Sequence, residues 1–241
     1  MLQPRLRFPR FTIADMVESQ CRLVAHLAID RLHAIVGASM GGMQALQWAV
    51  SHPRAMRKVV ALAPLAKTPA WSAAVNETSR RALMADPAWP DDVPHAGWAT
   101  WTALMRVIAG STPDKLAATE PGDGALSRQL DRLTAQTAAA AFDAVDWVYQ
   151  TWAYDDHDVG IGHGGDWRRA LATVEAETLI MAPPLDLYNP SAAARAAADH
   201  ITGARFVGVP TVEGHQCTTG RNISDTLFIN AAMREFLWID P

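Results

Sequence analysis

Cysteine, long apolar runs and an excess of one charge are all scarce in this sequence. Its two cysteines, Cys21 and Cys217, lie far apart and fit neither a metal-ligand spacing nor a disulfide framework, which favours a reducing, cytoplasmic environment. No segment approaches the roughly 18 apolar residues of a membrane-spanning helix. The basic start, Met1–Arg10, lacks the apolar core of a signal peptide.

The charge balance excludes a further class of protein. A net charge of −4 without long charged runs lacks the basic surface typical of nucleic-acid-binding proteins. We therefore expect a protein of the cytoplasm that binds neither a membrane nor a nucleic acid.

Apolar residues, and tryptophan in particular, are abundant. Hydrophobic residues make up 49% of the 241 positions and charged residues 19%, which is typical of a globular domain with a sizeable core. Most of the nine tryptophans lie between Trp71 and Trp167. They either line an apolar site or simply belong to the core.

Short apolar runs alternate with helical patterns at both ends of the chain, which indicates parallel strands joined by crossover helices. We expect an α/β fold with a mostly parallel sheet of about four strands. These strands are expected at residues 32–36, 58–63, 178–182 and 205–209. The intervening segment is rich in alanine and tryptophan, helical by composition, and broken by proline and glycine. We predict a core formed by residues 1–64 and 177–241, with residues 65–176 inserted as a helical lid.

The motif Gly37-Ala38-Ser39-Met40-Gly41 follows the first predicted strand and opens a helix. A G-x-S-x-G sequence in this setting is typical of the nucleophile elbow of the α/β-hydrolase fold, where a sharp turn exposes the serine Oγ. We expect the backbone N–H of Met40 to face the oxyanion that forms when Ser39 attacks a carbonyl group. A phosphate-binding loop is disfavoured because the spacing of G-x-G-x-x-G and the lysine of a Walker loop are both absent.

A nucleophilic serine needs a base, and the base needs an acid to orient it. Asp186 follows the third predicted strand and His215 follows the fourth. Their chain order is that of an α/β-hydrolase triad, and both lie at the carboxyl ends of strands, where open parallel sheets hold their sites. Taken singly, Asp186 is more typical of a turn or helix cap, and His215 of a surface or core histidine. Together with Ser39 they predict a catalytic triad.

Other charged residues give weaker signals. The acidic run Asp155–Asp158 with His163 could suggest a metal site, but its spacing matches no known ligand set, so we favour a solvated loop and predict no metal. Arg80 and Arg106 are candidates for binding a substrate carboxylate, with surface salt bridges as the alternative.

Further residues beyond the elbow follow the pattern of a known family. They are Phe8-Pro9, Thr12-Ile13, Asp15-Met16-Val17, the run from Gly37 to Ala49, Asn76-Glu77 with Arg80, and Phe142-Asp143-Ala144 with Tyr149. Through these residues the sequence resembles the homoserine O-acetyltransferases. The resemblance implies an acyl-enzyme on Ser39, Asp186 and His215 as its partners, no bound cofactor, and acyl-CoA as a co-substrate. The acceptor would be an alcohol, or water as in ester-hydrolysing relatives. Arg80, Arg106, Trp147 and Tyr149 would bind the substrate.

Departures from the family pattern argue against homoserine as the acceptor. Gln216 stands where the family has an aspartate that helps to hold the amino group of homoserine. Trp147 stands where the family has a lid tyrosine, and Pro113 replaces another. Because losing a paired charge changes substrate binding strongly, we expect a divergent small ester or alcohol substrate in a less polar pocket.

Family members also carry a long segment before the point where this sequence begins. That segment includes the first strands and a loop that gives a second oxyanion N–H. We therefore expect an exposed sheet edge through which the chain self-associates or binds a partner. Losing one oxyanion donor costs roughly 10²–10³ in rate. The alternative to an active enzyme is a catalytically incomplete fragment or pseudoenzyme that binds a partner.

Overall fold

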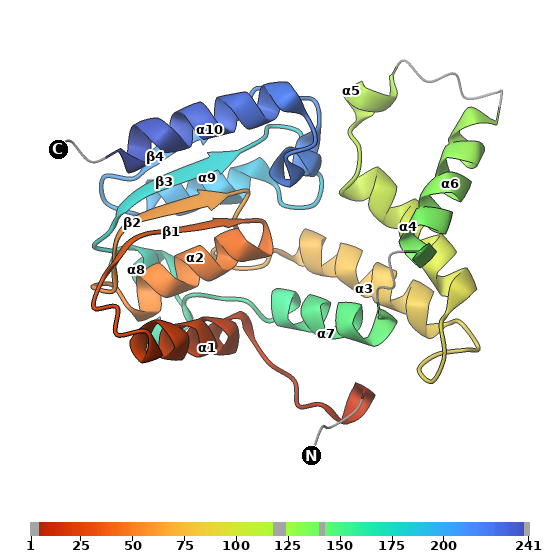
Figure 1. Ribbon diagram of the computed structural model, residues 1–241, viewed down its shortest axis with the longest axis horizontal. Coiled ribbons are helices and arrows are strands. Elements are labelled where there is room, and N and C mark those ends of the chain that lie inside the picture. Colours follow the sequence, from red (N-terminus) through yellow and green to blue (C-terminus); the bar gives the residue numbers. More distant parts are fainter. Residues whose placement is uncertain (1–4, 118–123, 140–142, 239–241) are drawn as a thin grey trace.

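The computed structural model describes residues 5–117, 124–139 and 143–238 (Figure 1). Phe142 and the outermost residues of the predicted core ranges therefore lie outside the described part. Within it, no helix is long or apolar enough to cross a membrane.

The core of the fold is a four-stranded parallel sheet in the order β1-β2-β3-β4. The strands are β1 (Leu32–Ala38), β2 (Met56–Leu62), β3 (Glu177–Ala182) and β4 (Arg205–Gly208). In the register, Val36 pairs with Val60, and Val60 pairs with Leu179. The predicted α/β fold with about four parallel strands is confirmed, with strand ends shifted by two residues or fewer.

Helices cover both faces of this sheet. On one face, α2 (Met40–Ser51) packs on β1 and β2, and α9 (Ser191–Asp199) packs on β3 and β4. The largest core cluster lies here, and α1 (Ile13–His26) packs behind α2. On the other face, Ile229 and Phe236 of α10 (Ile223–Leu237) pack on alternate residues of β2 and β3. The alternation follows from the period of two along a strand.

The long connection between β2 and β3 is helical (Figure 1). It contains α3 (Ala70–Met84), α4 (His95–Ile108), α5 (Pro113–Leu116), α6 (Ala125–Ala139), α7 (Ala144–Asp155), η2 (Ile161–His163) and α8 (Trp167–Leu171). Helix α4 packs against α3 and α6, and α3 also packs against α7. Ala170 and Leu171 of α8, however, belong to the large core cluster under the sheet. The exact boundary between core and lid stays a prediction.

Strand β1 is an edge of the sheet. Among the described residues it pairs only with β2, so one row of its backbone N–H and C=O groups has no strand partner. The Val36 side chain is 49% exposed, although its register partner Val60 is fully buried under α10. This edge is therefore both unpaired and partly apolar.

Candidate active site

Ser39 lies at the turn between β1 and α2 in a backbone conformation that serine rarely adopts. Its φ is 55° and its ψ is −121°. A hydrogen bond of 2.8 Å from the Ser39 N–H to the carbonyl of Leu62, the last residue of β2, fixes the turn. A Cβ at Gly37 would lie 2.0 Å from the Gly41 carbonyl oxygen, so only glycine permits the backbone of the elbow to close this tightly. The result is a serine held away from helical geometry at the start of a helix.

The three predicted triad residues are in direct contact. The Ser39 Oγ lies 2.9 Å from His215 Nε2, and His215 Nδ1 lies 2.7 Å from Asp186 Oδ2. Because a carboxylate accepts, Nδ1 carries the hydrogen, which leaves Nε2 as the acceptor for the Ser39 hydroxyl. Asp186 and His215 are 5% and 8% exposed, so both contacts are shielded from water.

The loop after β3 fixes the orientation of Asp186. Its second carboxylate oxygen, Oδ1, accepts the backbone N–H groups of Tyr188 at 2.8 Å and Asn189 at 2.7 Å. The Asn189 side chain donates to the Ala63 carbonyl at the end of β2. One oxygen of Asp186 is thereby used to build the loop, while the other is aimed at His215.

A chain of buried hydrogen bonds connects this loop to the lid. Tyr188 Oη donates to Asn76 Oδ1 at 2.6 Å, and Asn76 Nδ2 donates to Asp155 Oδ1 at 2.7 Å. Burial, above all, raises the pKa of the Tyr188 hydroxyl and that of the Asp155 carboxyl. The Tyr188 ring also lies edge-on to the His215 imidazole, with ring centroids 5.2 Å apart. Helices α3 and α7 of the lid therefore help to hold the acid and base of the triad.

Arg80 has a structural role that argues against its predicted binding of a substrate carboxylate. It is 5% exposed and forms ion pairs with Asp155 at 2.6 Å and Glu77 at 2.9 Å. Two carboxylates already neutralise its charge, so it joins α3 to α7 inside the lid. Hydrogen bonds from Arg81 and then Arg80 lower the pKa of Glu77.

Tyr149 also makes contacts within the fold. Its hydroxyl donates to the Phe8 carbonyl, and its ring stacks on Phe11 with centroids 6.1 Å apart. The side chain thus fastens the segment before α1 to α7. The hydroxyl and one ring face of Tyr149 are thus used within the fold, and its binding of substrate stays a prediction.

Trp147, in contrast, lies near the elbow. It packs in the same apolar cluster as Met40, Trp101 and Ala109, and its ring meets Trp101 edge-on at 4.9 Å. The buried indole N–H groups of Trp101 and Trp147 have no hydrogen-bond partner among the described residues. Buried donors are normally satisfied, so these two N–H groups are exceptions. Two tryptophans of the inserted segment therefore pack against the same apolar cluster as Met40 of the elbow.

Met40, the predicted oxyanion donor, and Arg106, the remaining predicted substrate-binding residue, lie at separate positions. Met40 is the first residue of α2, where backbone N–H groups have no partner within the helix. Arg106, in the last turn of α4, lines a cavity that also contains Gln216, the residue after His215.

The acidic run in the lid uses its ligand atoms within the fold. Asp155 pairs with Arg80, and Asp158 pairs with Lys67 at 2.8 Å. His157 is buried with its Nε2 3.0 Å from the Leu65 carbonyl, and burial lowers its pKa to about 4. Asp155, His157 and Asp158 thus each have a partner within the fold.

A different group of potential ligands was missed by spacing arguments. Glu18 and Cys21 of α1 meet His52, with one ligand atom of each within 4.8 Å of the others. His52 caps the end of α2 opposite Ser39, so this group is separate from the triad.

Sequence reasoning did not assign roles to Asn76, Tyr188, Asn189 or Trp101. The sequence does carry a signal for Tyr188 and Asn189, because an aspartate side chain in an Asx turn accepts backbone N–H groups that follow it closely in the chain. Asn76 belongs to the Asn76-Glu77 pair that carries the family resemblance, but its contact with Tyr188 spans 112 residues of sequence. Nothing in the local pattern predicts such a contact.

Comparisons with known proteins agree with this architecture. Residues 3–102 match the family described as the alpha/beta hydrolase fold. The homoserine O-acetyltransferase of Thermobifida fusca is 35% identical over 229 residues, which cover 87% of this chain and 60% of that protein.

Solved structures extend the likeness over nearly the whole chain. The crystal structure of the homoserine O-acetyltransferase of Bacillus anthracis superposes with a TM-score of 0.87 at 25% identity, covering 98% of this chain and 68% of that one. Esterase E22 gives a TM-score of 0.83 at 25% identity, covering 97% and 68%.

This chain spans about 60% of the length of the first curated relatives that it matches. Within that length, the sequence likeness, the parallel sheet and the serine elbow agree with one another. The chain has the α/β-hydrolase fold and is similar in sequence to the homoserine O-acetyltransferases over the length that it shares with them.

Proposed function

We propose that this protein transfers an acyl group through an ester formed on Ser39, as an O-acyltransferase that uses acyl-CoA or as an ester hydrolase. The single observation that carries the proposal is the continuous contact from Ser39 Oγ through His215 to Asp186, built on a turn that holds Ser39 at φ 55°. A serine with ordinary helix-capping geometry would not need this conformation.

In the first half-reaction, Ser39 Oγ attacks the carbonyl carbon of the acyl donor while its proton passes to His215 Nε2. The charge that develops on the carbonyl oxygen faces the N–H of Met40, at the positive end of α2. When the intermediate collapses, the bond to the leaving thiol or alcohol breaks. The leaving group takes the proton from His215, and the acyl group remains on Ser39.

In the second half-reaction, His215 Nε2 takes the proton of an acceptor hydroxyl, whose oxygen attacks the acyl-enzyme. When this second intermediate collapses, the bond from the acyl carbon to Ser39 Oγ breaks and Ser39 recovers its proton from His215 Nε2. An alcohol gives a new ester and water gives the free acid. Asp186 keeps the imidazole in the required tautomer in both steps, because Nδ1 stays bound to Oδ2. Whether alcohol or water is the acceptor depends on how well the surface near Met40 excludes water, and Trp101 and Trp147 belong to the apolar cluster that Met40 contacts.

The nucleophile is tested with a serine-directed fluorophosphonate probe. We expect the wild-type chain to be labelled and the Ser39→Ala variant to remain unlabelled. Absence of labelling in a folded wild-type chain would overturn the proposal. Transfer is separated from hydrolysis by supplying acetyl-CoA with and without a small alcohol and identifying the product. Ester formation identifies a transferase, whereas acetate alone identifies a hydrolase.

A second candidate function is favoured by the edge strand. Because β1 has no partner on its outer side among the described residues, the chain is suited to pair with a second copy of itself or with another strand. Light scattering tests this. We expect a dimer that Val36→Lys converts to monomer, whereas Val212→Lys, at a loop position of similar exposure, leaves it unchanged. A wild-type monomer at all concentrations contradicts self-association.

A further inference from the structure

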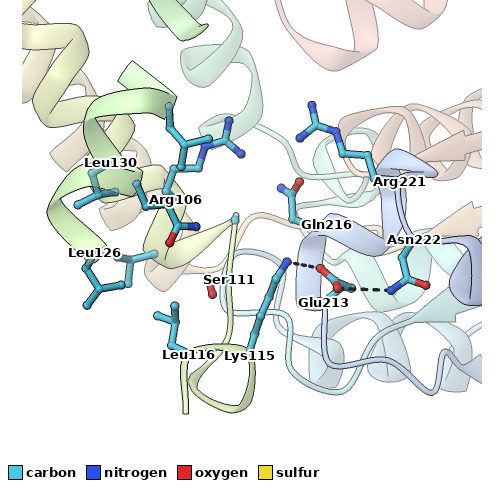
Figure 2. Close-up of a pocket in the computed structure, with 14 residues that line it drawn as sticks. Arg106, Ser111, Lys115, Leu116, Leu126, Leu130, Glu213, Gln216, Arg221 and Asn222 are labelled. Carbon is cyan, nitrogen blue, oxygen red and sulfur yellow. Dashed lines mark hydrogen bonds and ion pairs between the residues drawn. The ribbon is translucent and has the colours of Figure 1, made fainter. Parts of the chain in front are cut away.

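A cavity of about 540 Å³ lies between the lid and the loop that carries His215 (Figure 2). Its walls come from the end of α4, from α5 and α6, and from η3 (Gly214–Thr219) with the residues that follow it. Gln216 lines the cavity directly after His215 in the chain. Its side chain donates to the Ala109 carbonyl at 2.8 Å, which joins η3 to the lid. The cavity therefore adjoins the candidate triad through one residue.

The charges in this cavity are unbalanced. Lys115 forms an ion pair with Glu213, whose carboxylate also accepts from Asn222, so these two charges cancel. The hydrogen bond from Lys115 is the main cause of the lowered pKa of Glu213. Arg106 and Arg221 remain, and neither guanidinium has an ion pair or hydrogen bond with any described residue. The described lining thus carries two uncompensated positive charges.

The two arginines point toward each other. Figure 2 shows both guanidinium groups extending over Gln216 from opposite walls of the cavity. Burial is the first cause of a lowered pKa at Arg106, and the positive charge of Arg221 is the second. Two facing cations repel each other unless an anion lies between them, and guanidinium groups bind planar or tetrahedral oxyanions through paired hydrogen bonds.

The remaining wall has a different character. Leu116, Leu126, Leu130 and Leu133 line the lid side, opposite the polar wall formed by η3. Gln216 is uncharged and Glu213 is already paired, so the described lining offers no free carboxylate to an ammonium group. A zwitterion is therefore a poor match, whereas a molecule with an anionic head and an apolar tail matches both walls.

We propose that this cavity binds a small amphipathic molecule whose head carries two negative charges, such as a phosphomonoester or a pair of carboxylates. Arg106 and Arg221 hold the head, and the leucine wall holds the tail. If the proposed chemistry at Ser39 is correct, this molecule is the anionic part of a substrate. The binding site itself does not depend on that chemistry.

Binding is measured by calorimetry on the Ser39→Ala variant, so that a failure of catalysis does not affect the result. The probes are hexyl phosphate, hexylmalonate, hexanoate and inorganic phosphate. We expect a dianion with a hexyl tail to bind at least tenfold more tightly than hexanoate and than inorganic phosphate. Comparing hexyl phosphate with hexylmalonate identifies which dianion the site prefers.

Substitutions locate the site. Arg221→Ala and Arg106→Ala, each made in the Ser39→Ala background, should weaken binding at least tenfold, and Arg221→Lys should weaken it less. Arg22→Ala, at an exposed position on α1, is the matched control and should leave the affinity unchanged. Equal binding of hexyl phosphate and hexanoate, or full affinity in Arg221→Ala, overturns the proposal. No binding of either dianion overturns it as well.

Discussion

Tyr188 and Asn76 join the loop after β3, which carries Asp186, to the lid through one buried hydrogen bond of 2.6 Å. Tyr188 lies two residues after Asp186, and its ring packs against His215. Asn76 lies in α3 and continues the chain of contacts to Asp155. The geometry of the acid and base thus depends on a contact with the inserted helices as well as on the sheet.

Removing the Tyr188 hydroxyl should lower both stability and reactivity. Tyr188→Phe leaves Asn76 Oδ1 buried without its donor, which costs about 1–3 kcal/mol in the free energy of unfolding. We also expect slower fluorophosphonate labelling of Ser39, because the loop that orients Asp186 loses a support. Tyr149→Phe is the matched control, since it removes another tyrosine hydrogen bond, far along the chain from the triad. Equal labelling rates in the two variants would contradict this positioning role.

Replacing Asp186 with asparagine should remove most activity while preserving the fold. The Asn Oδ1 can still accept from the Tyr188 and Asn189 N–H groups, but its NH₂ group would face His215 Nδ1 and favour the wrong tautomer. A loss of roughly 10⁴ in turnover is expected for this change. Ester hydrolysis and thermal unfolding are measured together. Wild-type turnover in Asp186→Asn would remove Asp186 from the proposed mechanism.

Two glycines of the elbow should respond differently to alanine. At Gly37 a Cβ would lie 2.0 Å from the Gly41 carbonyl oxygen, whereas at Gly41 a Cβ meets nothing within 4 Å. Gly37→Ala should therefore destabilise the protein by at least about 1–3 kcal/mol, as overpacked sites do. Gly41→Ala should be neutral or slightly stabilising, since alanine favours helices. Urea unfolding of both variants checks this, and equal stabilities would show that the elbow relaxes.

Stability should fall on mild acidification because of His157. Its pKa is lowered from 6.5 to about 4 by burial, so between these values the unfolded chain binds a proton that the folded chain does not. The free energy of unfolding then decreases as the pH falls from 6.5 to 4, by about 3 kcal/mol in total. Unfolding curves of wild type and His157→Asn across this range isolate the effect. Equal pH dependence in the two proteins would contradict this role of His157.

Local patterns predicted the sheet and the triad positions, because each depends on short-range rules. Buried strands appear as apolar runs, and parallel strands place Ser39, Asp186 and His215 at one edge. The roles of Arg80 and Tyr149 were not predictable in the same way. Their partners, Asp155 and Phe8, are 75 and 141 positions away, and a family pattern does not reveal whether an arginine is already neutralised. The anion-binding role proposed for Arg221 could not be predicted from the sequence, because it depends on Arg221 facing Arg106 in the fold.

The backbone of Ser39 has a consequence for how this sequence can change over time. A non-glycine residue in the left-handed region costs roughly 1–2 kcal/mol, which glycine would not incur. If the chemistry at Ser39 were lost, drift to glycine would relieve this strain and would be favoured by folding alone. Under the proposed function, the serine is kept at this position against the preference of the backbone, and relatives with glycine there would mark lineages that kept the fold and abandoned the reaction.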